Sequence, residues 1–368
     1  MKRVLCAMSG GVDSSVAALL LLEQGYEVIG VTMVLTPFDS LSENPCEDEL
    51  LACSKEAADA RKVAQRLGIE HIVIDYRSLF SDEVMMPFYR AYISGFTPNP
   101  CIECNKQIKF GILHKLRIEM DCDFLATGHY AQIKYNDQNR TYELHKAADL
   151  SKDQSYVLYH IDQDLLAHTL FPLGAFTKVQ TRKFALDAGF EVAQKAESQD
   201  ICFIPDGDYA SFIEQFISEV EQADFKPEPG PIVDVQGRVL GTHRGLLYYT
   251  IGQRKGLGVA VGEPLFVLEK NTETNTLIVG RSYETGIESL YANKCSFPSH
   301  DEFFDWVPVQ AKINYRARMR NGSALYRDNQ LIVRFDEPIR GAAPGQAVVL
   351  YEGDRVVAGG TIASSVHD

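Results

Sequence analysis

One short segment near the start of the chain, residues 3–25, limits the possible folds more than any other. An apolar run, RVLCAM, leads into SGGVDSS, whose last two serines begin an apolar helical pattern, SSVAALLLLEQ, with Gly25 just beyond it. Paired glycines let the backbone approach an anion closely, and the first amides of a helix favour negative charge. The segment therefore predicts a strand, an anion-binding loop and a helix, in that order.

The alternation of strand and helix continues through the first half of the chain. Strands are expected over 27–33, 71–75 and 123–130, and helices over 55–68, 79–93 and 105–120. Such alternation is typical of a doubly wound α/β fold, a mostly parallel sheet with helices on both faces, whose ligands bind beyond the carboxyl ends of the strands. SGGVDSS and TGHY (127–130) both follow expected strands, so we expect them at the same edge of the sheet.

The pattern changes after about residue 205. A Pro-rich stretch, KPEPGPIVD, is followed by short alternating segments over 246–252, 264–271 and 276–282. A second β-rich block runs from about 286 to the end, with strands expected over 309–319, 330–336 and 346–353. We therefore expect an α/β domain over 1–205, a small β-rich domain over 206–285 and a further β domain over 286–368.

Charge is distributed unevenly along a chain whose formal net charge is −14. Acidic residues crowd into 39–59 and 191–228, whereas 235–262 and 307–327 contain no Asp or Glu and several Arg and Lys. The net charge argues against a nucleic-acid partner, but the two basic stretches are what an RNA-binding surface needs. From charge alone, an RNA footprint and the solvated faces of β-structure are equally good interpretations.

The sequence has no feature of a membrane or secreted protein. It contains no continuous apolar run of about 18 residues, the length of a membrane span, and no signal-peptide pattern. We therefore expect a cytoplasmic protein without a membrane partner. Its eight cysteines are then better interpreted as thiols than as a disulfide framework.

The SGGVDSS loop differs from the phosphate loop of kinase-type enzymes. That loop, G-x-x-x-x-G-K-[ST], uses a lysine to contact the β and γ phosphates, and this one has Asp13 instead. The difference suggests that a nucleotide is cleaved at another bond. Carboxylate oxygen is also a ligand that Mg²⁺ prefers, which makes Asp13 a candidate metal ligand.

A strand followed by SGGxDS and a helix resembles the signature of the ATP pyrophosphatases (the PP-loop superfamily), which release pyrophosphate and adenylate their substrate. Five further motifs, TPNPCIECNKQIKF, ATGHYA, SKDQSYVLY, SQDICFI and YTIGQRKGLG, together resemble the tRNA-specific 2-thiouridylase family of that superfamily. The match extends over all three expected domains. It implies an adenine-nucleotide alpha-hydrolase-like (PP-loop) first domain and a β-barrel as the last domain.

The resemblance implies an ATP-dependent sulfurtransferase that acts on the wobble uridine of tRNA. ATP, with Mg²⁺, would adenylate the C2 oxygen, and a protein cysteine persulfide would supply the sulfur, giving 2-thiouridine, AMP and pyrophosphate. A second thiol is needed to release the sulfur or to resolve the persulfide. The implied partners are the anticodon stem-loop of tRNA and a sulfur-carrier or persulfide donor protein.

The resemblance also assigns residues to these steps. Cys104 would be the nucleophile and Cys202 the persulfide-bearing residue. Cys104 precedes an expected helix, so the helix N-terminus and Lys106 or Lys109 would lower its thiol pKa. The residues that would form the ATP site are Ala7, Met8, Ser9, Gly10, Gly11, Val12, Asp13, Ser14, Met33 and Gly128. Those that would contact the target base or the tRNA are Asn99, Pro100, Cys101, Lys152, Asp153, Gln154, Tyr315 and Arg316.

Several alternatives stay open at this point. Cys101 and Cys104 form a CxxC pair, so Cys101 is a spectator, a redox partner, or a ligand of an iron–sulfur cluster with Cys104, Cys202 and Cys53. No zinc site is expected, because no second CxxC or spaced His pair completes four ligands. Two other functions also fit: an ATP pyrophosphatase acting on a small molecule, and a tRNA-binding protein without catalysis.

Overall fold

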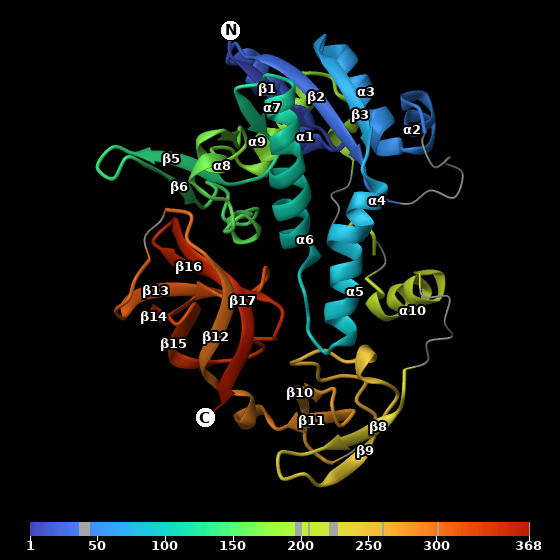
Figure 1. Cartoon of the computed structure of the whole chain (residues 1–368), viewed down its shortest axis with the longest axis vertical. Helices are drawn as coiled ribbons and strands as arrows, with labels where there is room; N and C mark the ends of the chain where they lie inside the picture. The colour runs from blue at the N-terminus through green and yellow to red at the C-terminus, as the bar shows by residue number, and fades with distance from the viewer. Residues whose placement is uncertain are drawn as a thin grey trace.

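The computed structural model describes residues 1–36, 45–195, 201–204, 207–220, 227–259, 261–299 and 302–367. In Figure 1 an α/β domain lies at the top, a β-barrel below it on one side, and a small β domain at the bottom. The expected boundary between the first two domains, residues 205 and 206, lies outside the described residues, and so do residues 39–44 of the first acidic stretch.

Five parallel strands form the sheet of the α/β domain, in the order β3-β2-β1-β4-β7. Their bounds are β1 Arg3–Ala7, β2 Glu27–Val34, β3 Glu70–Asp75, β4 Phe124–Ala126 and β7 Thr169–Leu170. In the register, Cys6 of β1 pairs with Gly30 on one side and Ala126 on the other. Because the strand order reverses at β1, the carboxyl end of β1 is the switch point at which such sheets bind ligands. The prediction of a doubly wound α/β domain is confirmed.

Helices cover both faces of this sheet, and successive residues of β1 alternate between the two cores. Val4 and Cys6 pack against one set of helices, whereas Leu5 faces the other core. On the first face lie α1 Val12–Glu23, α3 Lys55–Leu67 and α9 Lys178–Asp187. The second core contains residues of α7 Leu113–Glu119 and residues from the far end of the chain.

Two long helical segments run from the sheet toward the β domains (Figure 1). The first consists of α4 Arg77–Phe80, the π-helical segment η1 Ser81–Met85, and α5 Met86–Ile93. The second consists of α6 Pro100–Glu103, the π-helical segment η2 Cys104–Ile112, and α7. Both were expected, but each begins a few residues earlier than predicted. The remaining α-helices of the described residues are α2 Glu47–Cys53, α8 Gln163–Ala167 and α10 Tyr209–Val220.

The small β domain is a four-stranded sheet in the order β10-β11-β8-β9. Its strands are β8 Gly230–Val233, β9 Val239–His243, β10 Phe266–Asn271 and β11 Thr276–Gly280. The strand expected over 246–252 is wrong, because Leu246–Tyr248 forms a 3₁₀ turn, η5. Leu247 packs with α5 and α10, while Tyr249 packs in the core of the small sheet, so this segment joins two cores.

Six strands of the C-terminal region close into a barrel, because β12 pairs with both β15 and β17. They are β12 Ile287–Ser296, β13 Val307–Lys312, β14 Arg320–Arg327, β15 Gln330–Ile339, β16 Ala347–Glu352 and β17 Arg355–His367. The predicted barrel is confirmed. The strand expected over 309–319 is too long: β13 ends at Lys312, and the Asn314 side chain accepts a hydrogen bond from the Arg316 amide (3.0 Å) in the turn that follows.

A hairpin from the first half of the chain extends the barrel sheet, which the sequence did not predict. It consists of β5 Gln132–Asn136 and β6 Thr141–His145, and His145 pairs with Arg355 of β17. Leu144 of this hairpin lies in one core with Val349 and Tyr351 of β16. The barrel therefore covers the second face of the parallel sheet and shares its core.

Polar contacts reinforce this shared core. The Tyr156 hydroxyl donates to the Ala347 carbonyl (2.9 Å), and the Lys146 ammonium donates to the Gly353 carbonyl (2.7 Å).

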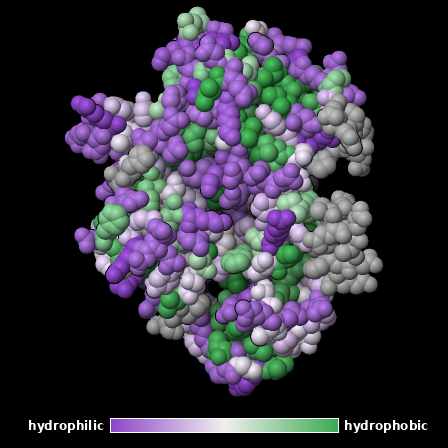
Figure 2. Space-filling model, viewed as in Figure 1, coloured by the Kyte–Doolittle hydropathy of each residue, from purple (hydrophilic) through white to green (hydrophobic). Residues whose placement is uncertain are grey.

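Figure 2 shows apolar residues in several separate groups on an otherwise hydrophilic face. None of the helices in the described part of the chain is long and apolar enough to cross a membrane.

The shared core generates a prediction about stability. Leu144→Ala leaves a cavity in a fully buried site, so we expect the free energy of unfolding to fall by about 2–5 kcal/mol. Trp306, the single tryptophan, lies beside β13 and reports on the barrel by its fluorescence. Urea unfolding should move to lower midpoints both by Trp306 fluorescence and by far-UV circular dichroism. Lys134→Ala, at an exposed site in the same hairpin, is the control, and an unchanged Trp306 transition in Leu144→Ala would contradict the shared core.

Candidate functional site

SGGVDSS forms the turn from β1 into α1 at the switch point of the sheet. Gly10 has a φ of 65°, which favours glycine, and a side chain there would collide with the backbone of Glu56 in α3. The Ser9 amide donates to Ser14 Oγ (3.1 Å), and Ser15 Oγ donates to the Gly11 carbonyl (2.8 Å). The loop is therefore held by its own serines and by close packing on α3.

The structure places the expected ATP-site residues of this segment in sequence along the turn. Ala7 ends β1, Met8 is buried, Gly11 is the N-cap of α1, and Val12 is the first residue of the helix. Asp13 and Ser14 thus lie in the first turn of α1, because the helix begins at Val12, two residues before the start that the sequence pattern indicated. The first amides of a helix have no partner within it, so this turn can bind an anion.

The TGHY segment lies against the SGGVDSS loop, as the strand pattern predicted. A side chain at Gly128 would come within 2.7 Å of the Ser14 amide nitrogen and 2.9 Å of the Asp13 carbonyl carbon. His129 is buried, and burial lowers its pKa well below the usual value. The neutral ring is hydrogen-bonded between Nδ1 and the Thr127 hydroxyl (2.7 Å). His129 is thus a packed residue of this loop.

Asp13 is held by two residues that the motifs alone did not identify as its partners. Lys178 Nζ, at the start of α9, lies 2.7 Å from both carboxylate oxygens of Asp13. The Tyr130 hydroxyl donates to the same carboxylate (2.9 Å). Tyr130 belongs to a motif visible in the sequence, ATGHYA, but Lys178 lies 165 residues from Asp13 and has no sequence signal. Asp13, the expected Mg²⁺ ligand, is therefore neutralised by a lysine from another part of the chain.

A second lysine also reaches the loop. Lys195 Nζ donates to the Gly10 carbonyl (3.2 Å) and to Asp59 of α3 (3.1 Å). Lys195 therefore ties the glycine turn to the helix behind it.

Cys104 lies within the second long helical segment and not before its start. The sequence-based expectation that the helix begins after Cys104 is wrong, because α6 begins at Pro100 and continues into η2. Asn99 is the N-cap, and its side chain accepts a hydrogen bond from the Cys101 amide (3.1 Å). Cys104 is 8% exposed, so burial raises its pKa, and Lys109 opposes this only in part. Lys109 thus lowers the pKa as expected. The prediction that the pKa of Cys104 falls overall is wrong, because burial outweighs the charge of Lys109.

Cys202 lies near Cys104 although the two are far apart in sequence. Cys202 itself is exposed, but the two residues that follow it, Phe203 and Ile204, pack in the apolar core that also contains Cys104. The Phe203 ring lies 5.6 Å from Phe80 and 5.7 Å from Phe88, edge to face in both pairs. Although Cys202 is exposed, the protein packed around its thiol removes part of the solvation and raises its pKa to about 12, and the Cys104 and Cys101 thiols add to the rise. The three thiols are therefore close enough to interact electrostatically.

Met33, an expected ATP-site residue, packs near the thiols. It lies near the end of β2, beside β1, and packs against the core that contains Cys104. One residue of the candidate ATP site therefore borders the core that contains Cys104. Within the described residues no group of three or more His, Cys, Asp or Glu side chains is placed to hold a metal ion, so an iron–sulfur cluster finds no support there.

The barrel holds the segment that precedes the thiols. The Thr97 amide donates to the Pro344 carbonyl (2.8 Å), and Gln346 Nε2 donates to the Thr97 carbonyl (2.8 Å). Gly345 has a φ of 92° and passes so close that a side chain there would lie 3.0 Å from Phe96 Cβ. The position of Asn99 and Pro100, the expected neighbours of the target base, thus depends on the barrel.

The expected tRNA contacts fall into two groups. Asp153 is buried and accepts hydrogen bonds from the Ala147 and Ser155 amides, and Gln154 Oε1 accepts one from the Tyr130 amide. This pair supports the loop that carries Tyr130, while the backbone of Lys152 is held in a turn with Asp149. Tyr315 and Arg316 form the other group, and both are exposed on the barrel.

Four arginines of the barrel surround a hollow of about 520 Å³, which we call the arginine hollow. Its charged lining residues are Arg316, Arg318, Arg320 and Arg340. Lys312 lies nearby, 5.4 Å from the centre of the Tyr315 ring. The second basic stretch of the sequence therefore forms a concave, positively charged surface on the barrel.

Comparisons with known proteins agree with this arrangement. Three family models match the chain: tRNA methyl transferase HUP domain over residues 2–206, tRNA methyl transferase PRC-barrel domain over 215–281, and Aminomethyltransferase beta-barrel domain over 288–362. The tRNA-specific 2-thiouridylase MnmA of Carboxydothermus hydrogenoformans is 46% identical, over 98% of this chain and 97% of that protein. The protein of the same name from Moorella thermoacetica is 48% identical, over 98% and 99%. The chain belongs to the tRNA-specific 2-thiouridylase family.

The resemblance of the sequence motifs to the 2-thiouridylase family is thereby confirmed. Among solved structures, a 4-thiouridine synthetase–RNA complex with bound ATP is 17% identical, with a TM-score of 0.38, over 60% of this chain and 51% of that chain. A predicted subunit of tRNA methyltransferase from Methanocaldococcus jannaschii is 18% identical, with a TM-score of 0.32, over 66% and 98%. Family membership therefore rests on the 2-thiouridylase relatives.

The electrostatics of the thiols give a prediction about reactivity. The thiolate is the reactive form, so a raised pKa makes Cys104 slow to react near neutral pH and faster as the pH increases. Lys109→Met removes the charge that lowers this pKa. If the pKa rises by about half a unit, the thiolate fraction at pH 8 falls about threefold, so alkylation of Cys104 by iodoacetamide should slow by about threefold or more. Tandem mass spectrometry measures the rate at each cysteine. Lys115→Met, exposed on the same helix, is the control. An identical pH–rate profile in Lys109→Met would contradict the assignment.

Proposed function

We propose that the protein 2-thiolates the wobble uridine of tRNA, using ATP to activate C2 and a cysteine persulfide to supply sulfur. The observation that carries the proposal is the nearness of the Cys202 thiol to Cys104, with which it interacts electrostatically, beside a core that Met33 near the end of β2 also contacts. A pair of thiols next to a nucleotide loop is what activation followed by sulfur transfer requires. Relatives along the whole chain that are named tRNA-specific 2-thiouridylase support the same function.

The SGGVDSS turn supplies the groups needed for ATP. Its amides and the start of α1 would bind phosphate oxygens, while Met33 and Gly128 would border the adenosine. Asp13 fits a Mg²⁺ ion bound with the phosphates, because its carboxylate is a hard oxygen ligand at the mouth of the turn. The ion would neutralise charge on the departing pyrophosphate. Adenylation makes the uridine C2 oxygen a leaving group.

The two thiols then divide the sulfur chemistry. With Cys202 carrying a persulfide, the terminal sulfur attacks C2, the C2–oxygen bond breaks, and AMP leaves with the bonding electrons. The Cys104 thiolate attacks the Cys202 sulfur, which leaves 2-thiouridine and a Cys104–Cys202 disulfide that an external dithiol reduces. In the other order, the Cys104 thiolate first attacks the Cys202 sulfur of the persulfide, which forms the disulfide and releases hydrosulfide. The hydrosulfide then attacks C2 and displaces AMP. Cys101 is next to this pair and needs no role in either order.

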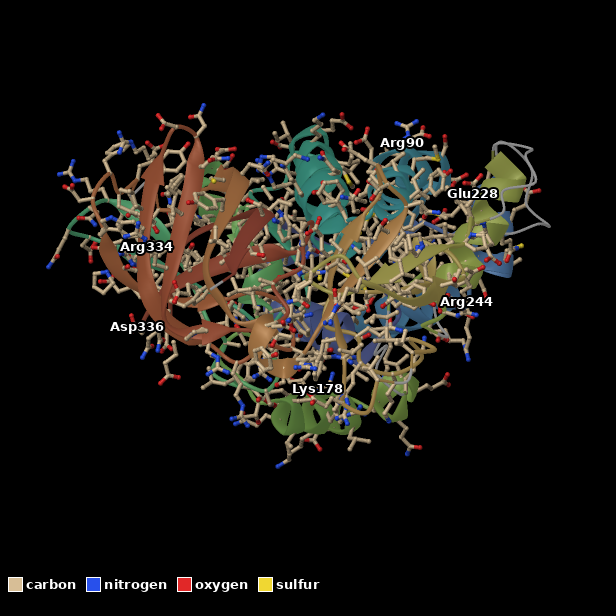
Figure 3. All side chains as sticks on the ribbon, turned by 90° about the horizontal axis from the view of Figure 1, so that it is seen from below. Arg90, Lys178, Glu228, Arg244, Arg334 and Asp336 are labelled. Atoms are coloured by element: carbon tan, nitrogen blue, oxygen red, sulfur yellow. The ribbon has the colours of Figure 1, made fainter. Side chains whose placement is uncertain are left out.

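The β domains would hold the tRNA. Figure 3 shows Arg334 on the barrel and Arg244 on the small β domain, on opposite sides of the molecule. Arg244 lies over the Tyr248 ring (4.0 Å), and Arg238 is paired with Asp234, so the first basic stretch is partly used within the protein. The arginine hollow gathers four arginines around one concave surface. We propose that it binds phosphates of the tRNA backbone.

A tRNA-dependent ATP–pyrophosphate exchange assay tests the function. We expect exchange in the parent protein and in Cys202→Ser, because adenylation needs no thiol, whereas Cys202→Ser should form no 2-thiouridine. Radiolabelled pyrophosphate and mass spectrometry of digested tRNA measure the two steps. Exchange with a small molecule and without tRNA would favour another ATP pyrophosphatase activity. Absence of exchange in the parent would favour a tRNA-binding protein without catalysis.

The placement of tRNA gives a separate prediction. Replacing both Arg316 and Arg318 with Glu should weaken tRNA binding and reduce its salt dependence, by about 0.7 to 0.9 in log–log slope for each phosphate that the protein no longer binds. Filter binding over a range of salt concentrations measures both effects, and the affinity for ATP should not change. Arg327→Glu is the control, because Arg327 lies at the far end of β14 beside Asp328 (3.7 Å). If Arg327→Glu weakened tRNA binding as much as the Arg316 and Arg318 replacements, the placement of tRNA at the arginine hollow would be contradicted.

A further inference from the structure

The anion-binding loop has no lysine of its own, yet the ammonium group of Lys178 reaches it from α9. In the sequence, Asp13 stands where other phosphate loops have a lysine, and in the structure Lys178 contacts both oxygens of Asp13. Resting on the ATP-dependent function proposed above, we propose that Lys178 binds the β and γ phosphates of ATP and holds the pyrophosphate as it leaves. The missing lysine of the loop is thus supplied from another element.

The place of Lys178 is set by the start of α9 and not by Asp13 alone. Thr177 caps the helix and shares reciprocal hydrogen bonds with Gln180, and the Lys178 amide donates to Asp149 Oδ2 (3.0 Å). The Lys178 side chain is 10% exposed, compared with 33% for Asp13. The ammonium is therefore enclosed by protein, with the more exposed carboxylate beside it at the opening of the loop.

An ammonium group in this position can contact a phosphate without losing Asp13. It has three donors on a flexible stem and requires no fixed coordination geometry. Lys195, the other lysine at the loop, contacts the Gly10 carbonyl and Asp59, and so acts on the backbone of the turn. Lys178 instead lies beside the first turn of α1, where the phosphates are expected. Figure 3 shows Lys178 apart from Arg244 and Arg334, the arginines of the two β domains.

The charge is needed at one step of the proposed reaction. In adenylation, the uridine C2 oxygen bonds to the α-phosphorus and the N3 proton passes to solvent. The bond from the α-phosphorus to the oxygen that bridges to the β-phosphate breaks, and its electron pair leaves with the pyrophosphate. Negative charge therefore increases on the β-phosphate as the bond breaks. A fixed cation there stabilises the transition state more than bound ATP.

A purely structural role for Lys178 makes a different prediction. If Lys178 only neutralised Asp13, its removal would weaken pyrophosphate binding because an uncompensated carboxylate would repel the anion. That effect would vanish once Asp13 was also made neutral. A double-mutant cycle with Asp13→Asn therefore separates the two roles.

The experiment measures binding of inorganic pyrophosphate by isothermal titration calorimetry, in EDTA so that Mg²⁺ plays no part. We expect Lys178→Met to weaken binding about tenfold or more, and by a similar factor when Asp13→Asn is already present. Binding of AMP, which lacks the β and γ phosphates, should stay within about twofold. Lys183→Met, exposed on the same helix, is the matched control and should bind pyrophosphate like the parent. Lys178→Arg should retain most of the affinity.

Each outcome decides between the possibilities. If Lys178→Met has no effect in the Asp13→Asn background, Lys178 only compensates Asp13 and the inference is wrong. If Lys178→Met loses AMP binding as strongly as pyrophosphate binding, its effect is a general disruption of the site, and the inference is again wrong. A parent protein that binds neither AMP nor pyrophosphate would overturn both this inference and the proposed function. Loss of the Lys178 effect alone would leave the proposed function standing.

Discussion

Burial of both faces of the five-stranded sheet is the constraint on which the rest of the molecule depends. β1 is apolar on both sides, and α1, α3 and α9 cover only one of them. The other face is covered by α7 together with β16 and the β5–β6 hairpin, so the sheet relies on the last part of the chain to complete its core. The barrel is therefore fixed relative to the sheet. Its contacts with Thr97 then fix the approach to the thiols.

The sequence predicted those parts of the molecule that depend on local patterns. Apolar runs and their spacing identified four of the parallel strands and the two long helices, and the glycines of SGGVDSS identified the turn. Contacts between distant segments could not be predicted. Lys178 gives no local signal, because its partner Asp13 lies on another element. The two-residue strand β7 and the hairpin β5–β6 owe their pairing to neighbours far along the chain.

The thiols show the same limit in their chemistry. Their positions follow from motifs, but the direction of their pKa shifts follows from packing. Cys104 lies several residues inside a helix and under an apolar core, so burial outweighs the charge of Lys109. Cys202 is anchored by Phe203 among aromatic rings, with other thiols nearby. Both shifts are upward, so a smaller fraction of either thiol is the reactive thiolate than in a free cysteine.

The shared core also determines how the chain behaves when it is cut. The hairpin from residues 132–145 forms part of the same sheet as the barrel, and Tyr156 and Lys146 hydrogen-bond to the backbone of β16 and its turn. A single break in the backbone between the small β domain and β12 would leave these contacts intact. Two fragments divided there should remain associated and should reassemble when expressed as separate chains. Neither fragment alone would bury the second face of the parallel sheet.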